Sequence, residues 1–172
     1  MTMDNVERRE KIAKVIKNSL TPISGNRLSE MFNVSRQIIV QDIALLRAEG
    51  LDIIATARGY ICTVTKTQGI IRTIAVQHDV NSIEDELKII IESGGNVIDI
   101  IVEHPIYGEI KGNLMIRSMY ELDLFLNDFE NKKAEPLSTV TNGIHLHTLE
   151  VPSQKIFIRI KEELREKKIL LY

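Results

Sequence analysis

The feature of this sequence that most constrains its fold is the alternation of strand and helix patterns after residue 69. Short runs rich in Ile and Val indicate strands, and the longer amphipathic runs between them indicate helices. The predicted elements are a strand at 70–78, a helix at 82–95, strands at 96–104 and 107–116, a helix at 118–133, a strand at 143–151 and a helix at 153–170. This order, β-α-β-β-α-β with an extra C-terminal helix, is that of the ferredoxin-like split βαβ fold. The expected sheet has the strand order 4-1-3-2 with antiparallel neighbours.

All four histidines of the chain lie at ends of these predicted strands. His78 ends the first strand and His104 ends the second. His145 and His147 begin the fourth strand, two residues apart and therefore on one face. Because the first strand lies beside the fourth and runs parallel to the second, the fold brings all four histidines to one edge of the sheet. Glu86, in the first turn of the helix that leaves this edge, joins them.

Four histidines and a glutamate at one edge favour a bound ligand. A single histidine at a strand end is more often bonded to the main chain, but chance gathering of all four is improbable. Imidazole and carboxylate donors without thiolate suit Zn, Ni, Fe or Mn. Two histidines of one strand face, one from a neighbouring strand and Glu86 make a four-ligand set. The residues therefore predict a metal site or a site for an anionic ligand, and their spacing does not choose the metal.

Asp99 is an unexpected charge in the apolar strand 96–104. Two interpretations are open. Its side chain lies on the solvent face of the sheet, or it orients one of the ligating histidines.

The first third of the chain has the pattern of a winged helix-turn-helix. Helical spacing of apolar residues predicts helices at 7–20, at 23–32 and at 36–50. The tripeptide 33–35 makes a tight turn, and Ser35 is a suitable N-cap for the third helix. Two β-rich runs, 51–56 and 60–64, flank a short turn and predict the hairpin that forms the wing.

The third helix has one apolar face and one face that suits a DNA major groove. Gln37 and Gln41 lie on the polar face with two alanines, and Arg36 stands at the helix N-terminus. Glutamine can bond adenine bidentately and arginine can bond guanine or phosphate. Arg58 lies at the tip of the predicted hairpin, where it either reaches DNA or is simply solvated. We expect Ser35, Arg36, Gln37, Gln41 and Arg58 to form the DNA-binding surface.

Composition and charge are consistent with a two-domain protein of the α+β class. Residues 1–66 hold ten Lys and Arg against seven Asp and Glu, whereas residues 67–172 hold twelve against seventeen. We therefore predict a DNA-binding domain at 1–66 and a regulatory domain at 67–172. The charged start is unlike a signal peptide, no apolar run is long enough to cross a membrane, and the single cysteine, Cys62, fits a cytoplasmic location.

These stretches resemble known families. The segment "LSEMFNVSRQIIVQDIALLRAEGLDI" is similar to the winged helix-turn-helix of biotin-repressor type. The stretches "VQHDVNSIEDEL", "VEHPIYGEIKGNL" and "GIHLHTLEV" resemble the 3H domain, and nearly the whole chain is similar to the niacin-responsive transcriptional repressors of that family. The resemblance implies a repressor of NAD-biosynthesis or niacin-transport genes that binds operator DNA with nicotinic acid as co-repressor.

The resemblance also implies roles for the clustered residues. It implies one transition metal ion per chain at His78, Glu86, His145 and His147. His104 would then help to hold nicotinic acid. Tyr107, three residues later, either stacks on the ligand ring or only shapes the hairpin.

Other functions use the same residues differently. A metal-dependent hydrolase could employ a His/Glu-ligated ion to activate water, but these motifs contain no additional carboxylate for a general base. In a third alternative the metal only holds two strands together in a DNA-binding protein with another effector. Because each chain has one reader helix, we expect a homodimer. Because the winged helix supplies a complete alternative purpose, we expect no enzymatic activity.

Overall fold

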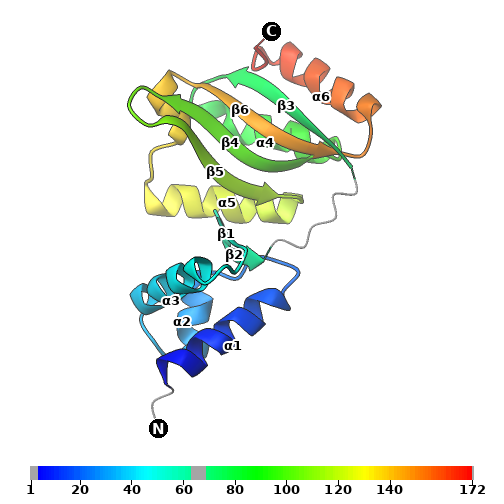
Figure 1. Cartoon of the computed structure of the whole chain (residues 1–172). Coiled ribbons are helices and arrows are strands. Elements are labelled where there is room, and N and C mark those ends of the chain that lie inside the picture. Colours follow the sequence, from blue (N-terminus) through cyan, green and yellow to red (C-terminus); the bar gives the residue numbers. More distant parts are fainter. Residues whose placement is uncertain (1–3, 63–68, 172) are drawn as a thin grey trace. The chain divides into compact units, whose positions relative to one another are not determined.

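The computed structural model describes residues 4–62 and 69–171, which form two compact units (Figure 1). The domain boundary predicted at 66/67 and the end of the predicted wing strand lie at 63–68, outside the described residues. No helix in the described parts of the chain is long and apolar enough to cross a membrane.

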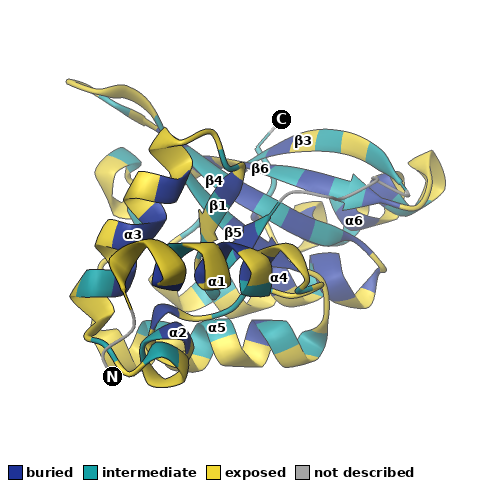
Figure 2. Ribbon diagram, turned by 60° about the horizontal axis from the view of Figure 1, so that its bottom comes forward, coloured by how far each residue is buried: buried dark blue, intermediate teal, exposed yellow. Residues whose placement is uncertain are grey.

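The first unit is a winged helix-turn-helix. Its elements are α1 (Asn5–Lys17), α2 (Gly25–Phe32), α3 (Arg36–Ala48), β1 (Ile53–Thr56) and β2 (Gly59–Cys62). The buried core residues are Ile12, Ala13, Ile16, Leu28, Ile39, Ile43, Leu46 and Ile53. Figure 2 shows buried and exposed residues alternating in bands along α1 and α3, as expected for amphipathic helices.

The turn between α2 and α3 is specified by its own residues. Asn33 ends α2 in the left-handed conformation with φ of 51°, which asparagine tolerates better than most residues. The hydroxyl of Ser35 then accepts a hydrogen bond from the Ile38 N–H at 3.3 Å, so the predicted N-cap is confirmed. Together they reverse the chain within three residues and start the predicted reader helix at Arg36.

A buried ion pair fastens α1 to α3. Arg8 donates through Nε and Nη2 to the two carboxylate oxygens of Asp42, at 2.7 and 3.1 Å. Both residues are buried. The hydrogen bond to Asp42 raises the pKa of Arg8, so the guanidinium stays charged in the core. The pair fixes how α3 is presented on the surface of this unit.

The second unit is a four-stranded antiparallel sheet with helices on one face (Figure 1). Its elements are β3 (Ile70–Gln77), the 3-10 turn η1 (Val80–Ser82), α4 (Ile83–Glu92), β4 (Asn96–His104), β5 (Gly108–Ile116), α5 (Met119–Lys132), the 3-10 turn η2 (Leu137–Thr141), β6 (Ile144–Val151) and α6 (Gln154–Glu166). The predicted order of strands and helices along the chain is confirmed, and with it the α+β class. Neither of these 3-10 turns was predicted.

The strand order differs from the ferredoxin-like prediction. The expected order 4-1-3-2 corresponds to β6-β3-β5-β4, but the observed order is β3-β6-β4-β5. All neighbours are antiparallel in both arrangements, so the alternation of residues could not distinguish them. The outer edge of β3 is partly covered by the chain after α6, where Leu171 N–H donates to the Ala75 carbonyl at 2.8 Å. With β3 at the edge, β6 lies between β3 and β4, and β4 still returns parallel to β3 as a split βαβ unit.

Candidate metal centre and nucleic-acid interface

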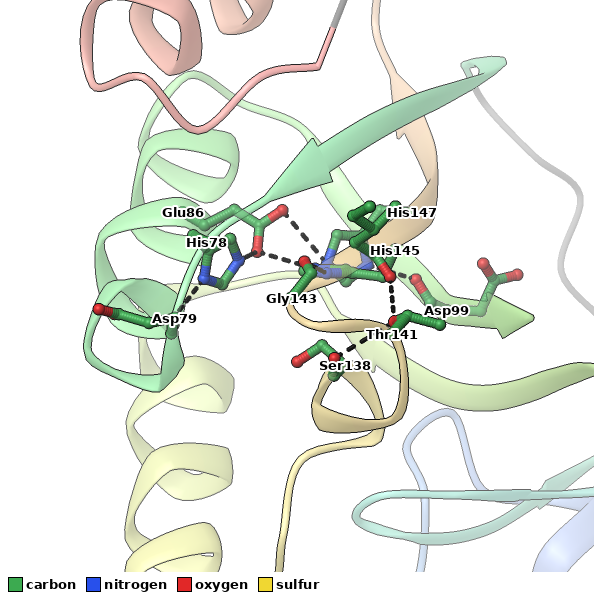
Figure 3. A network of polar contacts seen from close by, with 10 residues as sticks. His78, Asp79, Glu86, Asp99, Ser138, Thr141, Gly143, His145 and His147 are labelled. Carbon is green, nitrogen blue, oxygen red and sulfur yellow. Dashed lines mark hydrogen bonds and ion pairs between the residues drawn. The ribbon is translucent and has the colours of Figure 1, made fainter. Parts of the chain in front are cut away.

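Three elements bring the predicted ligands together (Figure 3). His78 directly follows β3, Glu86 lies in the first turn of α4, and His145 and His147 lie on β6. Val76 of β3 pairs with His145 and Ile74 pairs with His147. The alternation of β6 turns both histidines to the face that the helices cover, where they are buried.

Each of the three histidines faces the carboxylate of Glu86 through its Nε2 atom. Glu86 Oε2 lies 2.7 Å from His78 Nε2 and 3.4 Å from His145 Nε2. Glu86 Oε1 lies 3.3 Å from His147 Nε2. The side chains of all four residues are almost completely buried. A single buried carboxylate thus has three imidazoles around it.

The opposite ring nitrogen of each histidine is held by a main-chain carbonyl. Nδ1 of His78 lies 2.7 Å from the Asp79 carbonyl oxygen, and Nδ1 of His145 lies 2.9 Å from that of Gly143. Nδ1 of His147 lies 2.6 Å from the carbonyl oxygen of Asp99. A carbonyl oxygen can only accept, so each Nδ1 carries the hydrogen. In the neutral rings, Nε2 therefore presents a lone pair to Glu86.

The lone pairs of the three Nε2 atoms and the negative charge of Glu86 lie close together in a buried site. Such an arrangement is stable only if a positive charge lies between them. Within the described residues, Oε1 of Glu86 is buried, and its geometry with His147 Nε2, 3.3 Å away, is not that of a regular hydrogen bond. Protons or a metal ion can supply the charge. Burial raises the pKa of Glu86, but the charge of His147 and the hydrogen bonds from the three histidines outweigh it and hold that pKa well below its ordinary value.

The histidines show the complementary shifts. Burial lowers the pKa of His78, but the hydrogen bond with Glu86 outweighs burial and the net pKa is raised. The pKa of His147 is likewise raised, because attraction to Glu86 exceeds the cost of burial. Without a metal, the cluster therefore binds protons more strongly than free histidine does.

We predict that the metal-free protein loses stability as the pH rises from about 6 to 8. His78 and His147, with raised pKa values, contribute fully below about pH 6.5, and their contribution is lost as the pH rises through the raised pKa values. Glu86, with a lowered pKa, contributes above about pH 4.5, and its contribution is lost only in stronger acid. Thermal unfolding of chelated protein should give a lower midpoint for the second unit at pH 8 than at pH 6. Equal midpoints would contradict the proton-holding cluster.

The donor atoms fit a transition metal. Ligand atoms of His78, Glu86 and His145 all lie within 4.8 Å of one another. In a tetrahedral zinc site with bonds near 2.0 Å, neighbouring ligand atoms are roughly 3.3 Å apart. The separations of 3.3 Å from Glu86 Oε1 to His147 and of 3.4 Å from Oε2 to His145 are close to that spacing, whereas His78 lies nearer, at 2.7 Å from Oε2. The Nδ1–carbonyl bonds are the outer contacts that commonly orient metal-ligating histidines.

His104 and Tyr107 lie in a different setting. His104 Nδ1 accepts the N–H groups of Ile106 and Tyr107, at 3.1 and 3.3 Å, and so shapes the turn between β4 and β5. The two rings lie 4.8 Å apart, and Tyr107 is 75% exposed. Among the described residues, the group of ligand atoms within 4.8 Å of one another contains neither His104 nor His147. His147 nevertheless lies 3.3 Å from Glu86 Oε1, whereas His104 is bonded to the turn. The structure therefore gathers three predicted metal ligands, all histidines, around the fourth, Glu86, and it leaves the two predicted ligand-binding residues at the hairpin.

Two further residues support the cluster: Gly143, which the sequence analysis did not single out, and Asp99, for which it left two interpretations open. Gly143 has φ of +87°, and a Cβ there would lie 2.2 Å from the His78 carbonyl oxygen. Its own carbonyl receives both the His145 Nδ1–H and, at 3.4 Å, the His78 N–H. Asp99 is fully buried, so its placement on the solvent face is wrong. It contacts His147 through its main-chain carbonyl.

The cluster borders a cavity of about 450 Å³. Its lining comes from the end of β3, the segment that follows it, η2 and the turn before β6: Gln77, His78, Asp79, Val80, Ser138, Thr139, Asn142 and Gly143. His78 is shared between the cavity and the cluster. A volume of this size accommodates a small aromatic acid.

The predicted DNA-binding residues lie on the surface of the first unit. Ser35, Arg36, Gln37 and Gln41 are exposed, whereas Asp42 on the other side of α3 is buried. Arg58 lies in the two-residue turn between β1 and β2, as predicted, and is half-buried; its N–H donates to the Thr56 hydroxyl at 3.2 Å. The exposed side of α3 thus carries Gln37 and Gln41 together with the apolar side chains of Val40 and Leu45.

Comparison with known families agrees with both units. Residues 8–61 match an HTH domain, and residues 71–172 match the 3H domain. The class is therefore that of DNA-binding regulators that join a helix-turn-helix to a 3H domain.

Two curated relatives span almost the whole chain. The chain is 44% identical over 165 residues to the probable transcription repressor NiaR of Thermotoga maritima, which covers 96% of this chain and 94% of the relative. It is 36% identical over 167 residues to the transcription repressor NadR of Bacillus subtilis, covering 95% and 93% of the two chains. This protein belongs to the 3H-domain family of transcription repressors.

Proposed function

We propose that this protein represses NAD-biosynthesis or niacin-transport genes in the cytoplasm, with nicotinic acid as co-repressor and a transition metal at His78, Glu86, His145 and His147. The observation that carries the proposal is the buried carboxylate of Glu86 surrounded by three Nε2 atoms, each ring fixed by a carbonyl at Nδ1. Its donors suit Zn, Ni, Fe or Mn. The resemblance to niacin-responsive repressors supports the choice of effector.

The metal would supply positive charge and an open coordination position for an anionic or pyridine ligand. The chain's own contribution is to hold the three imidazoles in one tautomer and to exclude water from Glu86. We place nicotinic acid in the cavity that His78 shares with the cluster. The ring of the effector would lie between the segment after β3 and η2. Tyr107 is exposed at the tip of the β4–β5 hairpin and offers little burial to a ligand, and His104 is bonded to the turn.

Titration calorimetry with nicotinic acid, before and after chelation, tests this proposal. Binding that chelation abolishes supports the metal-assisted sensor. Binding that chelation leaves unchanged would contradict a role of the metal in ligand binding. An absence of heat with both preparations would contradict nicotinic acid as the effector.

An enzymatic function has less support. A hydrolase would need a free carboxylate beside the metal as general base. The nearby carboxylates have structural partners: Asp79 accepts the Asn81 N–H at 3.0 Å, and Asp99 accepts the Thr148 N–H at 3.0 Å. We therefore infer a regulator without catalytic activity. A metal that only ties β6 to the segment after β3 would predict no effect of any small molecule on operator affinity.

DNA reading is assigned to α3 and the β1–β2 turn. Substitution of Gln37 or Gln41 by alanine should reduce discrimination between operator and non-operator DNA by roughly 1–3 kcal/mol for each bidentate base contact. Arg58→Ala should instead lower affinity for all sequences and reduce the salt dependence by about one phosphate contact. Fluorescence anisotropy with specific and scrambled duplexes at several salt concentrations distinguishes the two. Equal losses on both duplexes for the glutamine variants would rule out base reading.

The operator complex is proposed to contain a homodimer. One reader helix per chain makes a weak monomer, and two would meet successive major grooves about 34–36 Å apart. Sedimentation of the operator complex measures its stoichiometry. One chain tightly bound per operator would contradict the dimer.

A further inference from the structure

Asp99 occupies an irregular position in the middle of the sheet. The pairing of β4 with both β5 and β6 shifts register between Val97 and Asp99, as in a β-bulge. The side chain of Asp99 is completely buried. A buried carboxylate is costly unless its oxygens are bonded, so its partners indicate why it is there.

The two carboxylate oxygens and the main-chain carbonyl oxygen of Asp99 contact three different residues. Oδ1 accepts the main-chain N–H of Thr148 on β6 at 3.0 Å. Oδ2 lies 2.5 Å from the ammonium of Lys111 on β5. The main-chain carbonyl oxygen lies 2.6 Å from Nδ1 of His147 (Figure 3).

In these contacts the carboxylate of Asp99 takes the place of its main-chain carbonyl as an acceptor in the sheet. Asp99 and Thr148 are direct partners in the β4–β6 ladder. In a regular antiparallel ladder, an N–H that points to the neighbouring strand donates to a main-chain carbonyl there. Here the Thr148 N–H meets the side-chain carboxylate, and the main-chain carbonyl of Asp99 meets an imidazole. The carboxylate thus takes a ladder donor and leaves the carbonyl available to His147.

We propose that Asp99 is a positioning residue for His147. Its carboxylate, paired with Lys111, holds the bulge so that its carbonyl fixes His147 as the Nδ1–H tautomer and directs Nε2 to Glu86. The effect on metal affinity rests on the proposed metal site. The tautomer of His147 does not, because it is a property of the metal-free protein.

Two variants and one control test this role. Asp99→Ala should weaken Zn²⁺ binding by about 10–100-fold in a competition titration, the usual effect of losing an outer partner of a ligating histidine. Asp99→Asn keeps an acceptor oxygen but loses the charge that faces Lys111, so it should weaken binding by a smaller factor, about 10-fold. Leu122→Ala removes a buried α5 side chain from the same core, and it should lower the thermal midpoint without changing Zn²⁺ affinity.

Nitrogen-15 NMR of the chelated proteins gives the second readout. At pH 8, His147 should be the Nδ1–H tautomer in the wild-type protein and should lose that preference in Asp99→Ala. Zn²⁺ affinities of both Asp99 variants within twofold of wild type would overturn the proposal, as would an equal loss in Leu122→Ala. If Asp99→Ala does not fold, the Zn²⁺ affinity of Asp99→Asn is the test, and an affinity within twofold of wild type would overturn the proposal. Failure of the wild type to bind Zn²⁺ would instead contradict the metal site, and the tautomer measurement would still decide the role of Asp99.

Discussion

Replacement of His145 by alanine is expected to abolish metal loading and the response to nicotinic acid while leaving weak DNA binding in place. His145 is buried at the centre of the cluster, with Nε2 3.4 Å from Glu86 Oε2 and Nδ1 held by Gly143. Loss of a direct ligand should weaken metal binding by more than the 10–100-fold that loss of an outer contact causes. The first unit has its own core and should keep its fold. Metal content by elemental analysis and operator affinity by anisotropy measure the two effects.

His104→Ala is the matched control for this prediction. It also removes one histidine at a strand end, but that ring is bonded to the β4–β5 turn. The control should load metal as the wild type does. Full metal content and an intact nicotinic acid response in His145→Ala would show that the assigned site is wrong.

Replacement of Asp42 by alanine should cost about 3–5 kcal/mol of stability in the first unit, because it leaves the Arg8 guanidinium buried without its partner. For a domain of this size, such a loss lowers the unfolding midpoint by more than about 10 °C. Calorimetry of the full chain should show this shift in the transition of the first unit. Operator affinity should fall with it, since α3 is fastened by the same pair.

An exposed ion pair provides the comparison. Lys11 and Glu7 form an i,i+4 pair on the surface of α1 at 2.7 Å, and Glu7→Ala should cost less than about 1 kcal/mol. Replacing both partners by apolar residues, as in Arg8→Met with Asp42→Leu, should recover most of the loss. An Asp42→Ala protein as stable as Glu7→Ala would mean that the buried pair contributes little.

The sequence predicted local structure well and the arrangement of the sheet less well. Strand and helix boundaries follow from residue periodicity, and Ser35 and Asn33 specify the turn that defines the helix-turn-helix. The position of β6 in the sheet cannot be predicted from residue periodicity, because both strand orders are fully antiparallel and bury the same residues of β6. In the observed order the outer edge of β3 meets the end of the chain, where Leu171 bonds to Ala75, almost a hundred positions away.

Three of the four histidines that were predicted to lie together do so, and the prediction was wrong for His104, which is bonded to the β4–β5 turn. β3 and β6 are neighbours in both orders, so His78, His145 and His147 meet either way. The contacts that fix their rings could not be predicted, because they use main-chain carbonyls of Asp79, Gly143 and Asp99. Any residue type has such a carbonyl, and only the three-dimensional fold shows which one an imidazole reaches.

Co-repression requires that the effector prefer the DNA-competent arrangement of the protein. A ligand that binds all arrangements equally shifts none of them, whatever its affinity. Coupling of this kind is typically 5–150-fold in affinity and is reciprocal, so operator DNA should tighten nicotinic acid binding by the same factor.

The most direct measurement of the central claim is operator affinity with and without nicotinic acid, on metal-loaded and on chelated protein. The account predicts that nicotinic acid tightens operator binding of the metal-loaded protein only, and that chelation removes the effect while basal binding remains. An equal effect of nicotinic acid on both preparations, or no effect on either, would contradict it.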